Sequence, residues 1–400
     1  MLVARRPWQT LAILAVTQVV AWGTLYYAIS IVALDIAHEM GWRNEVVYGA
    51  FSWCLLVAGL AATPAGALLD RYGGRRVMAA GSLLCGLGFI LLASAHSIAT
   101  YLFAWTVLGV AMAGVLYEAA FATINFEFGL QARQAISKLT LFAGFASTVF
   151  WPVTLKLNAL LGWRDTYLWY AAAQLLLCMP LHLLLGTQGA PLVKHQDRPD
   201  HSLQEALRHH AFWKLAFAFA ANSFVFSALS AHLIPILQNY GHPAGTVVFM
   251  AALIGPMQVL GRIGEMTFAR HIPPQQVGKF TFAILPLALL ALLFFGQHLV
   301  AVGFFCILYG LSNGILTIVR GTIPQQLFGA RNYGAISGAM AGPAMLARAA
   351  GPLAIAGVLQ MNTSPTMLFL LLLCCAVASL LFYLMAVRTA PQPAPLTTAQ

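Results

Sequence analysis

Long apolar stretches recur along the whole chain and are separated by short groups of polar and turn-forming residues. A helix needs roughly 20 residues to cross the hydrocarbon core of a bilayer. Twelve such stretches can be delimited, at residues 9–34, 46–69, 77–95, 100–127, 137–160, 165–187, 211–238, 246–269, 279–296, 299–322, 335–360 and 365–387. Because backbone polar groups in lipid must be satisfied within the segment, we expect helices rather than a barrel. The pattern predicts an all-α polytopic membrane protein with twelve transmembrane helices in two six-helix halves.

The composition supports a membrane protein. The chain has 400 residues, of which 60% are hydrophobic and only 8% are charged, whereas a soluble domain carries roughly a quarter charged residues. The formal net charge is +10. The basic residues lie in short loops and form no stripe or aromatic-interleaved groove, so nucleic acid is not an expected partner.

The basic residues also indicate an orientation. One set of loops carries only Arg43 and Arg164. The opposite set carries Arg5, Arg6, Arg71, Arg75, Arg76, Arg133, Lys138, Lys194, Arg198, Arg208, Lys214, Arg270, Lys279, Arg331 and Arg388. Cytoplasmic loops carry the excess of Lys and Arg. We therefore expect the second set, and with it both chain termini, to face the cytoplasm.

A polar segment near the middle of the chain, residues 186–210, separates the two groups of six stretches. We predict an N-terminal six-helix half at 1–187, a cytoplasmic linker at 188–210, a C-terminal half at 211–388 and a cytoplasmic tail at 389–400. Two equal halves of parallel orientation are typical of a duplicated transporter. Within the linker, Ser202 and Glu205 have the spacing of a helix capping box.

Enzyme motifs are not found in the sequence. There is no G-x-S-x-G, H-E-x-x-H or P-loop pattern, and the six cysteines all fall within apolar stretches without a CxxC pair. We expect no enzyme activity, no cofactor, no metal site and no disulfide framework. Because no ATP-binding segment is found, transport has to draw its energy from an ion or solute gradient.

The stretch Gly66-Ala67-Leu68-Leu69-Asp70-Arg71-Tyr72-Gly73-Gly74-Arg75-Arg76 follows the second span. It resembles the G-x-L-x-D-R-x-G-x-R/K signature of the major facilitator superfamily, in the loop where that family carries it. The resemblance implies that a gating motif of Gly66, Asp70, Arg71, Gly73 and Arg75 helps to close the cytoplasmic side. The corresponding region of the second half, 264–279, has no Asp-Arg pair.

Small residues support this interpretation physically. Ala58, Ala62, Gly66 and Asp70 are spaced by four and share one helix face, and Gly334, Gly338 and Gly342 form a similar face on the eleventh span. Such faces let helix backbones approach closely in lipid. We expect the two helices to pack across the halves, with Asp70 near the positive N-terminal end of the eleventh helix.

Two short stretches, 21–27 in the first span and 255–262 in the eighth, resemble the bacterial monocarboxylate-transporter-like group of this superfamily. In that group an arginine of the eighth span contacts the substrate carboxylate, and Arg262 occupies the matching position. Gln258 replaces the acidic residue that animal relatives carry four positions earlier. The resemblance implies a multi-pass protein of the bacterial inner (plasma) membrane that works as a monomer.

Four ionisable residues lie deep in predicted spans: Glu118, Lys156, Arg262 and Arg348. Each costs roughly 3 kcal/mol to insert at a helix centre and is a functional hypothesis by default. Arg262 and Arg348 suit an anionic group, since a guanidinium matches a carboxylate. Glu118 is the candidate proton carrier, because desolvation favours its neutral form. The alternative is that these charges only hold helices together.

Further polar residues are candidates for the wall of a cavity. Tyr26, Tyr27, Asn125, His232 and Asn313 fall on predicted spans. The alternative for His232 is a hydrogen-bonded packing role, and for the tyrosines a position at the membrane interface. Arg320, near the end of the tenth span, is interpreted as snorkelling to the cytoplasm, with contact to the substrate as the alternative.

These features together predict a secondary active transporter that moves a small organic anion, a monocarboxylate, by alternating access with coupled protons. The alternative is a proton-antiport exporter of amphipathic or cationic compounds, which the deep arginines disfavour by repulsion. A membrane enzyme or a non-transporting sensor is a third possibility. The expected partners are the solute, protons and membrane lipid.

Overall fold

The computed structural model describes residues 7–186, 200–360 and 365–389. The N-terminal half consists of α1 (Pro7–Trp22), η1 (Gly23–Tyr27), α2 (Ile29–Met40), α3 (Asn44–Ala93), α4 (Ile98–Val115), α5 (Tyr117–Phe128), η2 (Gly129–Gln131), α6 (Ala132–Ala143), α7 (Ala146–Ala173), η3 (Gln174–Cys178) and α8 (Met179–Leu183). The end of the linker forms α9 (Leu203–Arg208), and the C-terminal half consists of α10 (His210–Asn239), α11 (Ala244–Ala252), α12 (Ile254–Thr267), α13 (Pro274–Phe295), α14 (Leu299–Phe328), α15 (Tyr333–Gln360) and α16 (Pro365–Arg388).

Within the described residues, nine helical stretches are long and apolar enough to cross a membrane. Two of them contain 50 and 52 residues and turn back at a glycine of positive φ, Gly73 at 76° and Gly162 at 80°. Each of these two therefore holds a pair of crossings. Together with α15, the arrangement is consistent with the twelve predicted spans.

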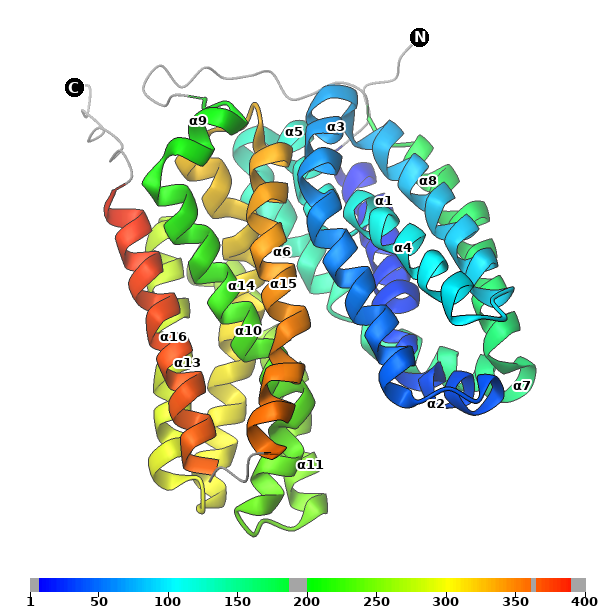
Figure 1. Cartoon of the computed structure of the whole chain (residues 1–400). Helices are drawn as coiled ribbons and strands as arrows, with labels where there is room; N and C mark the ends of the chain where they lie inside the picture. The colour runs from blue at the N-terminus through cyan, green and yellow to red at the C-terminus, as the bar shows by residue number, and fades with distance from the viewer. Residues whose placement is uncertain (1–6, 187–199, 361–364, 390–400) are drawn as a thin grey trace, which may run out of the picture.

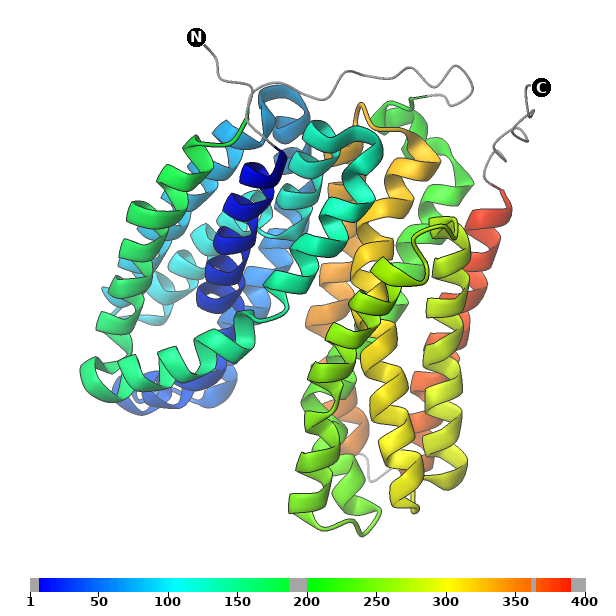
Figure 2. The same cartoon turned by 180° about the vertical axis from the view of Figure 1, so that it is seen from behind.

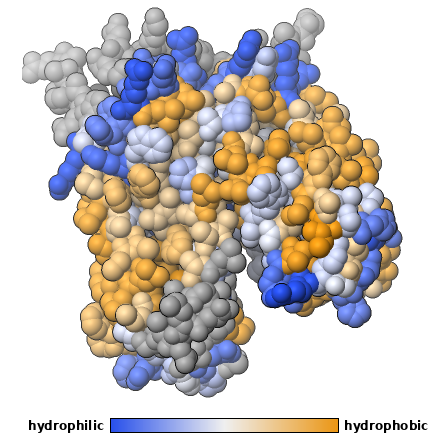
Figure 3. All heavy atoms as spheres, viewed as in Figure 1, coloured by the Kyte–Doolittle hydropathy of each residue, from blue (hydrophilic) through white to orange (hydrophobic). Residues whose placement is uncertain are grey.

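The surface is that of a membrane protein. Large apolar side chains such as Phe268 and Val300 are 86% and 84% exposed, which would be costly in water. Hydrophobic residues dominate the middle of the face in Figure 3, and hydrophilic residues gather at both of its ends. The predicted multi-pass helical fold is confirmed.

Two helix bundles stand side by side, the N-terminal half in blue to green and the C-terminal half in green to red (Figures 1 and 2). The bundles meet at the end where α1 begins and α16 ends, which we call the terminal side. They diverge toward the opposite end, where a hollow separates them (Figure 3). The molecule is therefore closed on the terminal side and open on the other.

The first crossing is longer than the predicted 9–34, since α2 continues to Met40. The polar residues that ended the predicted span have partners within the fold. Asp35 accepts a hydrogen bond from Asn158, and Glu39 pairs with Arg164 at 2.8 Å. Arg164 also donates to the carbonyl of Ala95 at 2.9 Å. These contacts tie together the open-side ends of the first, third, fifth and sixth crossings in the N-terminal half.

The predicted capping box at the end of the linker is confirmed. The backbone N–H of Glu205 donates to Ser202 Oγ at 3.2 Å, and the backbone N–H of Ser202 donates to Glu205 Oε2 at 2.7 Å. Just before it, Asp200 Oδ1 accepts from the backbone N–H of Ala330 at 3.0 Å. The linker end is thereby fastened to the loop that precedes α15. Linker residues 187–199 lie outside the described residues.

Candidate functional site

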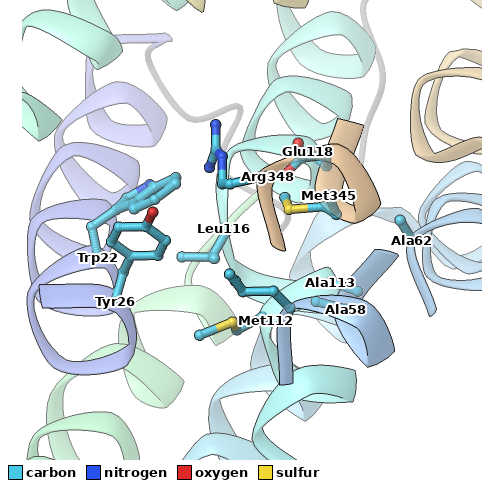
Figure 4. A pocket seen from close by; sticks show the side chains of 11 residues that line it. Trp22, Tyr26, Ala58, Ala62, Met112, Ala113, Leu116, Glu118, Met345 and Arg348 are labelled. Carbon is cyan, nitrogen blue, oxygen red and sulfur yellow. The ribbon is translucent and has the colours of Figure 1, made fainter. Parts of the chain in front are cut away.

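A pocket lies between the two halves (Figure 4). The N-terminal half supplies most of its wall, and α15 of the C-terminal half supplies Met345 and Arg348. Most of the lining is aliphatic, aromatic or thioether, and Glu118 and Arg348 are its only charged members. The remaining lining residues are Trp22, Tyr26, Leu55, Ala58, Ala62, Met112, Ala113 and Leu116. The wall of the pocket is therefore mostly apolar, with one acidic and one basic side chain beside it.

A π-helical turn, η1, shapes the aromatic side of the pocket. Such turns widen a helix locally and are frequent at functional sites. Gly23 opens this turn, and a Cβ there would lie 2.1 Å from the ring of Phe150 on α7. A glycine is therefore required for the close approach of the ring. Tyr26, which follows in the same turn, extends toward Trp22 in the pocket (Figure 4).

A break in the fourth crossing places Glu118. Leu116 has extended backbone angles, φ −80° and ψ −165°, and separates α4 from α5. Gln18 Nε2 donates to the carbonyl of Val115 at 2.5 Å and satisfies one group that the break frees. Glu118 then lies in the first turn of α5, where the helix dipole favours a negative charge.

Arg320 pairs with Glu118 across the two halves. Its Nη2 lies 2.7 Å from Glu118 Oε1, and the two side chains are only 22% and 14% exposed. The interpretation of Arg320 as a snorkelling residue is wrong, because a carboxylate within reach of α14 holds its guanidinium inside the molecule. Glu118 is thus paired with Arg320 rather than with Arg262 or Arg348, the two arginines that the sequence singles out.

Arg262 and Arg348 have no ion pair with any described residue, and the Nε atom of each is buried without a hydrogen-bond partner. Arg262, on α12, is 5% exposed. Its Nη1 occupies the space that a side chain at Gly144 would fill. Tyr27 lies in the neighbourhood of both guanidinium groups. The charge of Glu118 is balanced by that of Arg320. The positive charges of Arg262 and Arg348 therefore remain without a counter-charge among the described residues.

The other predicted residues lie at varying distances from this cluster. Asn125 is buried further along α5, where its amide donates to the carbonyl of Phe121 at 2.8 Å and its own oxygen has no partner. His232 is 3.0 Å from the carbonyl oxygen of Pro352, which matches the packing alternative. Asn313 is half-buried on α14, and Lys156 is exposed on α7. None of the four lines the pocket.

On the terminal side, α3 and α15 pack closely through their small residues. A Cβ at Gly66 would lie 2.0 Å from the carbonyl oxygen of Gly334, and one at Gly338 would lie 2.1 Å from that of Ala62. Asp70 accepts hydrogen bonds from the backbone N–H groups of Gly334 and Ala335, both at 2.8 Å. The expected packing of these helices is observed, and the gating role of the motif stays a prediction.

A second contact closes the terminal side and was missed in the sequence. Glu265, on α12 and 3% exposed, accepts from Arg133 Nε and from Ser137 Oγ, both at 2.8 Å. Arg133 also donates to the carbonyls of Ala269 and Ile272 at 2.8 and 2.6 Å. A signal was present, since Gly261 and Glu265 repeat the four-residue spacing of Gly66 and Asp70.

The chain is similar to known transporters. The family model described as Major Facilitator Superfamily matches residues 11–352. A protein of Thermoproteus tenax described as an uncharacterized 38 kDa protein in the 23S RNA operon is 27% identical over 320 residues, which are 78% of each chain. Among solved structures, the human organic anion transporter MFSD10 (TETRAN) has a TM-score of 0.72 at 16% identity and covers 95% of this chain and 100% of its own. The E. coli fucose:proton symporter FucP also has a TM-score of 0.72, at 15% identity, and covers 97% and 100%.

Proposed function

The chain belongs to the Major Facilitator Superfamily of transporters, and from this premise we propose that it carries a small organic anion, a monocarboxylate in the simplest case, by alternating access. The observation that carries the proposal is the pair of guanidinium groups, Arg262 and Arg348, that lack a carboxylate partner among the described residues. A buried cation without a counter-charge is costly, and an anionic substrate would supply that charge. A cation would instead meet two uncompensated positive charges.

Ligand-induced stabilisation of the purified protein tests the anion site. A ligand that binds only the native state raises its apparent stability. We expect small monocarboxylates to raise the melting temperature of the wild type and to lose that effect in Arg348→Gln and Arg262→Gln. Lys156→Gln is the matched control, since it removes an exposed positive charge outside the pocket. Stabilisation by lipophilic cations alone, or an unchanged response of both arginine variants, would favour the exporter alternative.

Glu118 is proposed to carry the coupled proton. It is a carboxylate held by Arg320 of the other half, so protonation would weaken one contact between the halves and make their relative movement depend on pH. In proteoliposomes we expect Glu118→Gln to retain exchange of labelled substrate while losing accumulation driven by a pH gradient. Accumulation at the wild-type level would remove Glu118 from the coupling step.

We also propose that the protein lies in a bacterial inner membrane with both termini in the cytoplasm. The support is the excess of Lys and Arg in the loops of the terminal side. In this orientation the hollow between the halves faces the periplasm, and the contacts of Asp70 and Glu265 close the cytoplasmic side. A reporter that fluoresces only in the cytoplasm, fused after Arg388, is expected to be bright. A dark fusion would show that the chain has the opposite orientation in the membrane.

A further inference from the structure

We propose that the pocket takes carboxylates that carry an aromatic ring, with the ring among the aromatic side chains of the first crossing and the carboxylate at the free arginines. This inference rests on the proposed function, because it names the body of the anion whose charge that function requires. It goes further because a short hydrophilic acid such as acetate or lactate would pair with the arginines and make no use of the apolar and aromatic lining.

Aromatic rings are concentrated beside the free guanidinium groups. Trp22 lies 5.3 Å from Tyr26 in an edge-to-face arrangement and 4.9 Å from Tyr117. Tyr26 meets Tyr27 at 5.4 Å and Phe51 at 5.5 Å, both edge to face. All five rings are half-buried rather than sealed in the core. Such rings prefer further aromatic partners at these separations, so a planar ring can extend the cluster.

The pocket also holds hydrogen-bond donors without acceptors. Trp22 Nε1 and Arg348 Nε are buried and have no partner among the described residues. Both side chains line the same pocket (Figure 4). A buried donor without an acceptor is costly, and a ligand that brings acceptor oxygens into the pocket supplies what is missing. The aromatic side chains and the donors that an anion would satisfy therefore lie in the same pocket.

The rest of the lining selects against polar substrates. Leu55, Leu116, Met112 and Met345 form much of the remaining wall together with three alanines. The leucines and alanines cannot pair with a hydroxyl group, and thioether sulfur is only a weak acceptor, whereas it makes favourable contacts with aromatic rings. A polyhydroxylated substrate such as a sugar would leave most of its hydroxyl groups unsatisfied against this wall. An unsubstituted aromatic ring has no polar groups to leave unsatisfied.

Two acids of equal charge and nearly equal size separate aromaticity from hydrophobicity. Benzoate and cyclohexanecarboxylate differ mainly in the π face, and aromatic contacts are worth about 0.5–1.5 kcal/mol beyond buried area. We expect the purified full-length protein to bind benzoate roughly two- to tenfold tighter than cyclohexanecarboxylate, and acetate more weakly than either. The measurement is equilibrium binding by isothermal titration calorimetry.

Substitutions in the pocket test whether its aromatic side chains cause the preference for benzoate. The preference for benzoate should fall toward one in Trp22→Leu and Tyr26→Leu, persist in Trp22→Phe, and be unchanged in Trp8→Leu, whose indole is 60% exposed on the same helix outside the pocket. Equal binding of the two ring acids by the wild type overturns the inference and leaves the anion proposal standing, provided Arg348→Gln abolishes both. No binding of any carboxylate overturns the proposed function itself.

Discussion

The ion pair of Glu118 and Arg320 is one residue-scale contact that joins the two halves beside the pocket. Both side chains come from long apolar helices, and each would be an uncompensated charge without the other. Neither Arg262 nor Arg348 shares this carboxylate, so the site keeps two positive charges for a ligand. In the proposed function, Arg320 is neutralised by Glu118, and Arg262 and Arg348 are left to bind the anion.

Breaking that pair on one side should destabilise the protein more than removing both charges. Removal of one partner from a buried pair costs about 3–5 kcal/mol. Because these side chains keep some exposure, we expect Arg320→Gln to lose about 2 kcal/mol, below that range. The double variant Arg320→Gln with Glu118→Gln should recover much of the loss. Thermal unfolding in detergent measures both, and a double variant less stable than either single variant would contradict a simple pair.

At the scale of elements, helix interruptions and close helix contacts place the site. The π-helical turn brings Tyr26 and Tyr27 beside Trp22, and the break at Leu116 starts α5 just before Glu118. The contact of α3 with α15 depends on glycine, because no side chain fits at Gly66. The closed terminal side is therefore a consequence of backbone packing as much as of charge.

Gly66→Leu should force α3 and α15 apart on the terminal side. The matched control is Gly49→Leu on the same helix, where a Cβ would meet nothing within 4 Å. With Cys374 and Cys375 replaced by serine, a cysteine at Ala335, which is 5% exposed, reports the opening through maleimide labelling. We expect Gly66→Leu to raise the labelling rate several-fold. A rate equal to that of the Gly49→Leu control would mean that this contact does not close the molecule.

The spans and the deep charges could be predicted because both are local features of the sequence. A single charge in an apolar run is visible without a structure, as Glu118, Arg262 and Arg348 were. The partners were not visible, since Arg320 lies 202 residues from Glu118 and Glu265 lies 132 from Arg133. Pairing of this kind depends on how the two halves pack, and the periodicity of apolar residues does not predict that packing.

At the scale of the whole molecule, two contacts related by the repeat close the terminal side while the opposite side stands open. Asp70 of α3 meets the N-terminal end of α15, and Glu265 of α12 meets Arg133 and Ser137 of α6. The pocket, whose wall includes Arg348, lies between the halves. The alternating access that we propose requires such a site to be exposed to one side at a time, and this arrangement would be one of the two states.

The most direct test of the account is uptake of a labelled organic anion into proteoliposomes under an imposed pH gradient. We expect the wild type to accumulate a monocarboxylate above equilibrium, and Arg348→Gln to reduce the rate to that of empty liposomes while Lys156→Gln retains it. The result that would contradict the account is uptake by Arg348→Gln at the wild-type rate, or gradient-driven movement of cations and not of anions.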